Sequence, residues 1–416
     1  MNEQIKKRVE QIRRGEVPEG YKHGRDGVYP KDWKSQRMKQ WLSLKERPVL
    51  LRDELSYQLV TVRRAFGGVD SRGKYYGKDV LVKNYFEVRQ GDLLISKRQI
   101  AHGACGVVPE KLDCAVVSNE YNVFVPEQGT DVHMFNLMMQ LPHYKRLFYL
   151  MSDGVHIEKL LFKTQDWMKR SLAMPPFEEQ KKIAAILTTQ DKVIELEEKL
   201  LTEKQRQKKY LCQQLLTGKK RLPGFGGDWK SEYLGKLVAE RVETKREDLP
   251  LLAITGTQGI IPRSELDLKD NSSEDKSKYL RICVGDIGYN TMRMWQGVSA
   301  YSNHEGIVSP AYTILKPVDS INAKYFAYLF KMPEVVFLFY RFSQGLVDDT
   351  RNLKYDNFKK IKVSYPMDKR EQDAIVERLS IADQEISLLQ KSIDAEKQKK
   401  KALMQLLLSG IVRVKV

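Results

Sequence analysis

The chain has 416 residues, enough for two or three domains, and 42% of them are hydrophobic, which excludes a disordered tail. The net charge of +17 indicates a polyanionic partner, either nucleic acid or an acidic membrane surface. No terminal polybasic block or uninterrupted apolar run occurs, so the charge favours a folded nucleic-acid binder over a membrane protein, with a merely soluble basic protein as the plain alternative.

The four cysteines form no C-x-x-C pair, and the six histidines show no ligand spacing around them. Neither a disulfide framework nor a zinc site is indicated, and a reducing cytosol is the simplest setting. The first residues, MNEQIKKRVEQIRRG, form a charged amphipathic helix without the apolar core of a signal peptide. We therefore expect a cytoplasmic protein.

Residues 1–27 are predicted to hold this short helix and a lead-in, and residues 28–172 a first globular domain. GDLLISKRQ at 91–99 is typical of a turn, a buried strand and a basic loop. The alternation at 115–126 predicts one or two strands, and 134–151 predicts two short helices divided by Pro142. Extended and helical pieces alternate, so we expect a mixed α+β (α/β) domain.

Residues 173–219 are predicted to form one long helix. From Ile183 to Leu215, steps of four and three residues follow one apolar stripe with a polar middle, and neither Pro nor Gly interrupts it before Gly218. At ~1.5 Å per residue such a helix spans roughly 60 Å, which suits a coiled-coil strut better than an ordinary core helix.

The chain then repeats itself. Residues 220–366 follow the plan of the first domain, and residues 367–416 predict a second long helix in which Ile183 returns as Ile375, an offset of 192. Glu179-Gln180 returns as Glu371-Gln372 at the same offset. Outside a few shared motifs, the sequences of the two globular segments have little in common. We infer that the two helices serve the same purpose in both copies, whereas the two domains serve different purposes.

This duplication predicts a pseudo-two-fold molecule in which two globular domains are separated by two long antiparallel helices. Such an arrangement would place two basic reading domains on a spacer, which suits a bipartite, asymmetric DNA site with a fixed gap. The basic runs 204–209 and 397–401 lie at matching places on the helices. They are either solubilising coiled-coil faces or surfaces for acidic partner helices or spacer phosphates.

The chain resembles the specificity subunits of type I restriction-modification systems over essentially its full length. The motifs that carry the resemblance are PPFEEQ at 175–180, QQLLTG at 213–218, RLPGF at 221–225, GDI at 285–287, YNTMRMWQG at 289–297 and EGIVSPAY at 305–312. The second copy departs from the pattern at 366–372, where the proline pair is lost.

The resemblance implies a DNA-reading subunit without chemistry of its own. Its domains would be two target-recognition domains, and its helices would dock two modification subunits that carry S-adenosylmethionine and methylate adenine. Two restriction subunits that use ATP and Mg can join such an assembly. The chain itself would bind double-stranded DNA, no membrane and no cofactor, in a bacterial or archaeal cytosol. The alternative is a stand-alone DNA-binding or scaffold protein without enzymatic partners.

The residues agree with a non-catalytic role. No phosphate-binding G-x-x-x-x-G-K-[ST] loop occurs, and MPPF at 174–177 lacks the Asn or Asp that an adenine methyltransferase places before its prolines. Prolines at that position suit the start of a helix. Glu197-Glu198-Lys199 is an ordinary solvated helix face, so an autonomous nuclease is disfavoured too.

Polar side chains in loops that follow strands are the best candidates for DNA contacts. Arg suits guanine and Gln suits adenine in the major groove, whereas Lys and Arg can also contact phosphates only. A tryptophan such as Trp295 can stack on a base or wedge between two, or pack in the core. The candidates are Lys97, Arg98, Gln99, His102, Asn290, Arg293, Trp295, Gln296, Arg351 and Asn352.

Overall fold

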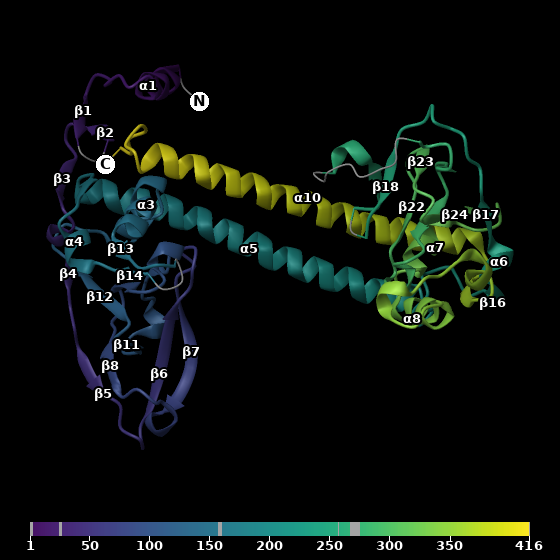
Figure 1. The fold of residues 1–416 in the computed structure, drawn as a ribbon, viewed down its shortest axis with the longest axis horizontal. Coiled ribbons are helices and arrows are strands. Elements are labelled where there is room, and N and C mark those ends of the chain that lie inside the picture. Colours follow the sequence, from purple (N-terminus) through teal and green to yellow (C-terminus); the bar gives the residue numbers. More distant parts are fainter. Residues whose placement is uncertain (1–2, 25–26, 157–159, 257, 267–274, 416) are drawn as a thin grey trace. The chain divides into compact units, whose positions relative to one another are not determined.

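The computed structural model describes residues 3–24, 27–156, 160–256, 258–266 and 275–415. They form two compact units, Met1–Glu197 with Ser392–Val416 (unit 1) and Glu198–Lys391 (unit 2). Each unit contains strands, short helices and one half of each of two long helices (Figure 1). The predicted mixed α+β fold is confirmed. Among the described residues, no helix has the length and hydropathy that a membrane crossing requires.

Two long helices lie within the predicted ranges 173–219 and 367–416, but both are shorter than those ranges. Helix α5 (Phe177–Leu215) and helix α10 (Lys369–Leu407) each have 39 residues, and both their starts and their ends are 192 positions apart. Every position of the predicted stripe on α5 is buried or half-buried. Each helix is followed by a glycine with positive φ, at Gly218 and Gly410, which is the usual left-handed helix stop.

Within each unit the helix halves run antiparallel and are joined by polar contacts. In unit 1, Lys400 pairs with Asp191 at 2.5 Å, and in unit 2, Lys208 pairs with Asp383. These two ion pairs occupy equivalent positions of the repeat. The basic runs on the helices are thus partly neutralised by carboxylates of the opposite helix.

Unit 1 builds its globular part around a four-stranded sheet of order β10-β9-β12-β4 and a five-stranded sheet of order β5-β8-β11-β6-β7. Only the β11–β6 contact is parallel among the pairs of these sheets. The elements before α5 are α1 (Glu3–Arg13), β1 (Tyr21–Gly24), β2 (Gly27–Pro30), β3 (Lys34–Arg37), β4 (Leu42–Leu44), β5 (Pro48–Leu50), β6 (Ser56–Val62), β7 (Val69–Tyr76), β8 (Asn84–Glu87), β9 (Leu93–Ser96), β10 (Cys105–Val107), β11 (Val116–Ser118), β12 (Tyr121–Pro126), α2 (Val132–Met138), α3 (Pro142–Leu150), β13 (Ser152–Asp153), β14 (Leu161–Phe162), α4 (Thr164–Met168) and β15 (Ser171–Met174).

Unit 2 repeats this plan around a four-stranded antiparallel sheet of order β17-β24-β21-β22. Its second sheet is reduced to the short pairs β18–β19 and β20–β23. The elements between the long helices are β16 (Trp229–Tyr233), α6 (Leu234–Leu237), β17 (Val238–Arg241), β18 (Leu252–Ile254), β19 (Ile260–Pro262), β20 (Leu280–Ile282), β21 (Ile287–Asn290), β22 (Ser299–Tyr301), β23 (Gly306–Val308), β24 (Tyr312–Pro317), α7 (Ala323–Leu329), α8 (Pro333–Phe342), α9 (Tyr355–Phe358) and β25 (Lys362–Pro366).

The ends of the long helices belong to the cores of the globular parts. Ile183 of α5 and Leu407 of α10 pack in the unit 1 core, and Leu215 and Ile375 pack in that of unit 2. Pro142 and Pro333 each begin the second helix of a helical pair, at the first turn, where a missing N–H costs nothing. The helices are therefore extensions of the cores rather than separate rods.

The repeated Glu-Gln motif at the start of each long helix has two structural roles. The buried Gln180 amide accepts from the Asp131 N–H at 2.8 Å and donates to the Pro175 carbonyl at 2.9 Å, which ties the helix to its globular part. Gln372 makes the equivalent contacts in unit 2. The glutamate beside it, Glu179 or Glu371, binds an arginine that follows the end of the other long helix.

Candidate nucleic-acid interface

The repeated Gly-Asp motif fixes the strand that leads to each candidate loop. Asp92 and Asp286 are 3% and 2% exposed and follow glycines with positive φ. Asp286 accepts the Cys283 N–H at 2.8 Å and the Arg241 guanidinium at 2.7 and 3.1 Å. Asp92 makes the same kind of pair with Arg47. A buried carboxylate with these partners holds the turn before the strand in one conformation.

After each of these strands, the chain makes the same short turn. Residues Ile100–His102 and Met294–Gln296 form single 3-10 turns, and each ends at a glycine with φ near +75°, Gly103 and Gly297. Ile100 and Met294 point into the cores, which leaves their neighbours at the surface. The predicted strand-then-loop arrangement is confirmed in both units.

In unit 2 this loop presents two unengaged polar side chains. Arg293 and Gln296 are exposed, and neither side chain makes a hydrogen bond or ion pair with any part of the chain that the structure describes. Asn290 has a different role, because its side-chain oxygen accepts the Met292 N–H at 3.0 Å and shapes the turn. An arginine and a glutamine free to donate are suitable for reading base edges.

Trp295 of this loop packs edge-on against Tyr340, and Arg351 lies over the Tyr340 ring. The Arg351 guanidinium lies 4.1 Å from the Tyr340 ring centre and 6.0 Å from that of Trp295. The arginine also pairs with Asp348 at 3.2 Å. Trp295 is half-buried and its indole N–H donates to the Met292 carbonyl. The cluster supports the loop, so Trp295 is neither a core tryptophan nor a fully exposed wedge.

The structure thus brings the second domain's candidates together. Asn352 pairs with Gln344 in an isolated bridge, and the next residue, Leu353, donates its N–H to the Thr291 carbonyl at 2.8 Å. The segment that carries Arg351 and Asn352 is therefore joined to the loop that carries Arg293 and Gln296.

In unit 1 the equivalent loop is more strongly engaged with its own domain. The Lys97 ammonium donates to the Asn119 carbonyl at 2.6 Å, and Arg98 pairs with Glu120 at 2.6 Å on the surface. Gln99 and His102 are half-buried. A DNA contact by Lys97 or Arg98 would therefore exchange an internal partner for a phosphate or a base.

Sequence reasoning missed a second element of the unit 1 surface, the turn between β6 and β7. Its residues Ala65 and Phe66 both have positive φ, at 55° and 57°, a conformation that side chains rarely adopt. Their N–H groups donate to the carbonyls of His102 and Gly103 at 2.8 Å. The turn also carries two arginines, at 63 and 64. Gly67-Gly68 after the alternating run 56–62 was a hairpin signal that could have found it.

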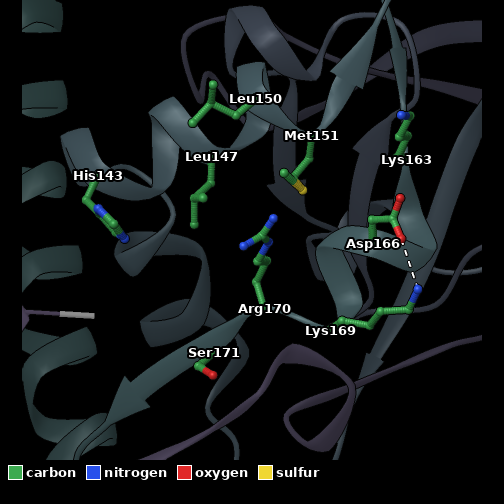
Figure 2. A pocket seen from close by; sticks show the side chains of 9 residues that line it. All are labelled: His143, Leu147, Leu150, Met151, Lys163, Asp166, Lys169, Arg170 and Ser171. Carbon is green, nitrogen blue, oxygen red and sulfur yellow. Dashed lines mark hydrogen bonds and ion pairs between the residues drawn. The ribbon is translucent and has the colours of Figure 1, made fainter. Parts of the chain in front are cut away.

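A separate cavity of about 430 Å³ in unit 1 lies between α3, α4 and β15. Leu147, Leu150 and Met151 line one side, and the Arg170 side chain extends toward them (Figure 2). Lys169, also in its lining, pairs with Asp166 at 3.0 Å. No residue of the candidate loop lines this cavity among those described.

The described residues contain no group of three or more His, Cys, Asp and Glu side chains that could hold a metal ion. The site consists of loops with hydrogen-bond donors on two rigid, related scaffolds. Such an arrangement can bind a polyanion and discriminate its surface.

Comparisons with known proteins agree with the sequence and the fold. Residues 30–204 match the family model of the type I restriction modification DNA specificity domain. The S subunit of a type I restriction-modification system from M. genitalium has a similar fold, with a TM-score of 0.58 and 13% identity over 90% of this chain and 96% of that one.

A second structure, which concerns complex assembly and conformational transition of the type I R-M system, superposes with a TM-score of 0.54. Its identity is 16%, over 92% of this chain and 99% of that one, so the likeness is one of fold. Residues 30–204 therefore match a type I restriction modification DNA specificity domain, and the fold of the chain is similar to the folds of these two solved structures.

Proposed function

We propose that the chain reads a bipartite, asymmetric DNA site and directs modification and restriction subunits to it. Residues 28–172 and 220–366 are its two target-recognition domains, and each reads one half of the site. The helices at 173–219 and 367–416 set the gap between the halves, and 1–27 is a lead-in. The chain contributes recognition rather than catalysis.

One observation carries this proposal. Both units contain the same buried Asp–Arg pair before the strand that leads to the candidate loop. The residues of the loop itself differ between the units. In unit 2 the loop offers an unengaged Arg293 and Gln296, and in unit 1 the same positions are Gln99 and His102. Two domains that share a scaffold but carry different loops are suited to recognise two different half-sites. Phosphate contacts by lysines and arginines would fix the register of each reader.

The long helices supply a surface for protein partners. Beside the buried stripe, α5 exposes a row of apolar side chains within unit 1, in which Ile186, Val193 and Leu196 are 39%, 37% and 54% exposed. In unit 2, Leu388 of α10 is 67% exposed and occupies the repeat position of Leu196. Exposed apolar rows of this kind mark interaction sites. We infer that two adenine methyltransferase subunits dock there, one for each repeat.

Cofactors then belong to the partners: S-adenosylmethionine to the modification subunits, and ATP and Mg to two restriction subunits where these join. Because the proposed substrate is cellular or invading DNA, we place the assembly in the cytosol.

The test is to co-express the chain with an adjacent methyltransferase gene and map methylated adenines in host DNA by single-molecule sequencing. We expect a split motif with a constant gap, and replacement of residues 220–366 should change one half of it only. A stable complex without methylation would instead favour a scaffold protein without enzymatic function. A continuous, unsplit motif would contradict the two-reader proposal.

The gap between the half-sites should follow the length of the helices. Removing one heptad from both α5 and α10 shortens the pair by about 10.5 Å, and at ~3.4 Å per base pair the gap should shrink by about three base pairs. Methylation of duplexes with graded gaps measures this. Removing one heptad also rotates the helix faces little, so the stripe stays in register. An unchanged gap preference would show that the helices do not act as a ruler.

A further inference from the structure

A groove in unit 2 opens beside the candidate reading loop. Its volume is about 440 Å³. The turn between β18 and β19, strand β22, helix α7 and one residue from each long helix form its walls. The described residues that line it are Lys208, Thr255, Gly256, Gln258, Gly259, Ser299, Ala300, Tyr301, Asn303, Lys324, Ala327, Tyr328, Lys331 and Asp383.

The side chains that line the groove have a net positive charge. Three lysines line it, whereas Asp383 carries the single carboxylate among its described lining residues. That carboxylate is already used, because it pairs with Lys208 and accepts the Tyr328 hydroxyl at 2.6 Å. The other two lysines, Lys324 and Lys331, have no ion pair within the described chain.

Lys331 connects the groove to the reading loop. Its ammonium donates to the carbonyl of Gly297, the last residue of the loop, at 2.7 Å. The residue as a whole is exposed, and desolvation of the ammonium lowers its pKa to about 8. A desolvated ammonium without a carboxylate gains free energy when an anion binds near it. Lys324, on α7, lies 5.8 Å from the Tyr301 ring centre, and its ammonium has no other partner among the described residues.

The repeat shows that the scaffold does not need these two lysines. The equivalent positions in unit 1, found from the aligned helix caps Asp131 and Asn322, hold His133 and Gln140. Lys208, by contrast, has the equivalent Lys400 with the same kind of aspartate partner. The two extra cations are thus a property of this groove and not of the fold.

We propose that this groove binds a backbone phosphate of the DNA strand next to the bases read by the loop of unit 2, with Lys324 and Lys331 as its cationic ligands. The inference rests on the proposed function and adds a phosphate-positioning site to it. Lysine ammoniums are point charges that suit a phosphate oxygen, whereas the planar donors that select bases, Arg293 and Gln296, lie on the loop itself.

The test compares Lys324→Gln with Lys324→Arg in the full chain assembled with its modification subunits. Binding of a fluorescent duplex that carries the mapped site is measured over a series of salt concentrations. Each lost phosphate contact lowers the slope of log affinity against log salt by about 1. We expect this loss for Lys324→Gln, together with an equal weakening on duplexes with single base changes, and we expect Lys324→Arg to keep the wild-type slope.

Lys316→Gln is the matched control, since this lysine is exposed on β24 outside the groove lining. Its slope should stay close to that of the wild type. A Lys324→Gln slope equal to the wild-type slope would overturn the phosphate site, as would a change confined to particular bases. If the proposed function itself is wrong, the result is distinguishable, because the wild-type assembly would then show no preference for a split site.

Discussion

Replacing Arg221 with alanine is expected to destabilise unit 2 by about 3 kcal/mol, because it leaves a buried carboxylate without its partner. Arg221 follows the end of α5 and binds Glu371, near the start of α10, through two parallel contacts of 2.5 Å. The Glu371 side chain is only 2% exposed, and it raises the pKa of the arginine through this hydrogen bond. Urea unfolding of the full chain measures the loss as a lower midpoint.

Two further variants make this result specific. Lys219→Ala removes a neighbouring exposed cation and should leave the unfolding midpoint nearly unchanged. Adding Glu371→Gln to Arg221→Ala should recover part of the lost stability, because a neutral amide costs less to bury than a carboxylate. If Arg221→Ala behaves like Lys219→Ala, the ion pair does not hold the helix ends together.

Unit 1 contains the equivalent arginine–glutamate pair between the ends of the two long helices. Arg413, which follows the end of α10, binds Glu179 at the start of α5 through two contacts of 2.7 Å and also binds Asp32. Arg413 is the repeat position of Arg221, and Glu179 is that of Glu371. Each unit therefore joins the start of one long helix to the exit of the other, which explains why the glutamate is kept in both copies.

The helices could be predicted from the sequence because their apolar pattern involves residues that are close in the chain and continues over many turns. A stripe that persists for about forty residues, with a glycine stop and an offset of 192, leaves little room for another structure. The sequence also marked Glu179 as a repeated position. It could not assign the role of this residue, because its partner Arg413 lies 234 positions away and only folding brings them together.

The candidate site shows the same limit. The loops at 97–102 and 291–296 could be predicted because a turn, an apolar run and polar residues follow one another in the chain. The stacking of Arg351 on Tyr340 and the bonds from Ala65 and Phe66 to the unit 1 loop could not, since they join separate segments. Such through-space contacts decide which side chains support the loop and which remain available for the proposed DNA contacts.

Arg293 is therefore the residue whose removal should change sequence recognition most. Its side chain is exposed in the turn that follows β21 and has no partner within the described chain. A bidentate contact from arginine to guanine is worth about 1–3 kcal/mol of discrimination. We expect Arg293→Ala to relax the preference at one base pair of one half-site by roughly 5- to 150-fold, and to leave the other half unchanged.

Competition binding with duplexes that carry each single base change measures this effect, using the assembly with its modification subunits. Gln296→Ala should relax a neighbouring position, because glutamine suits adenine. Lys316→Ala, which removes an exposed cation on β24, should leave the pattern of base preferences as it is. If Arg293→Ala instead weakens binding equally on every duplex, this arginine contacts phosphate, and base recognition in unit 2 falls to Gln296 and the residues around it.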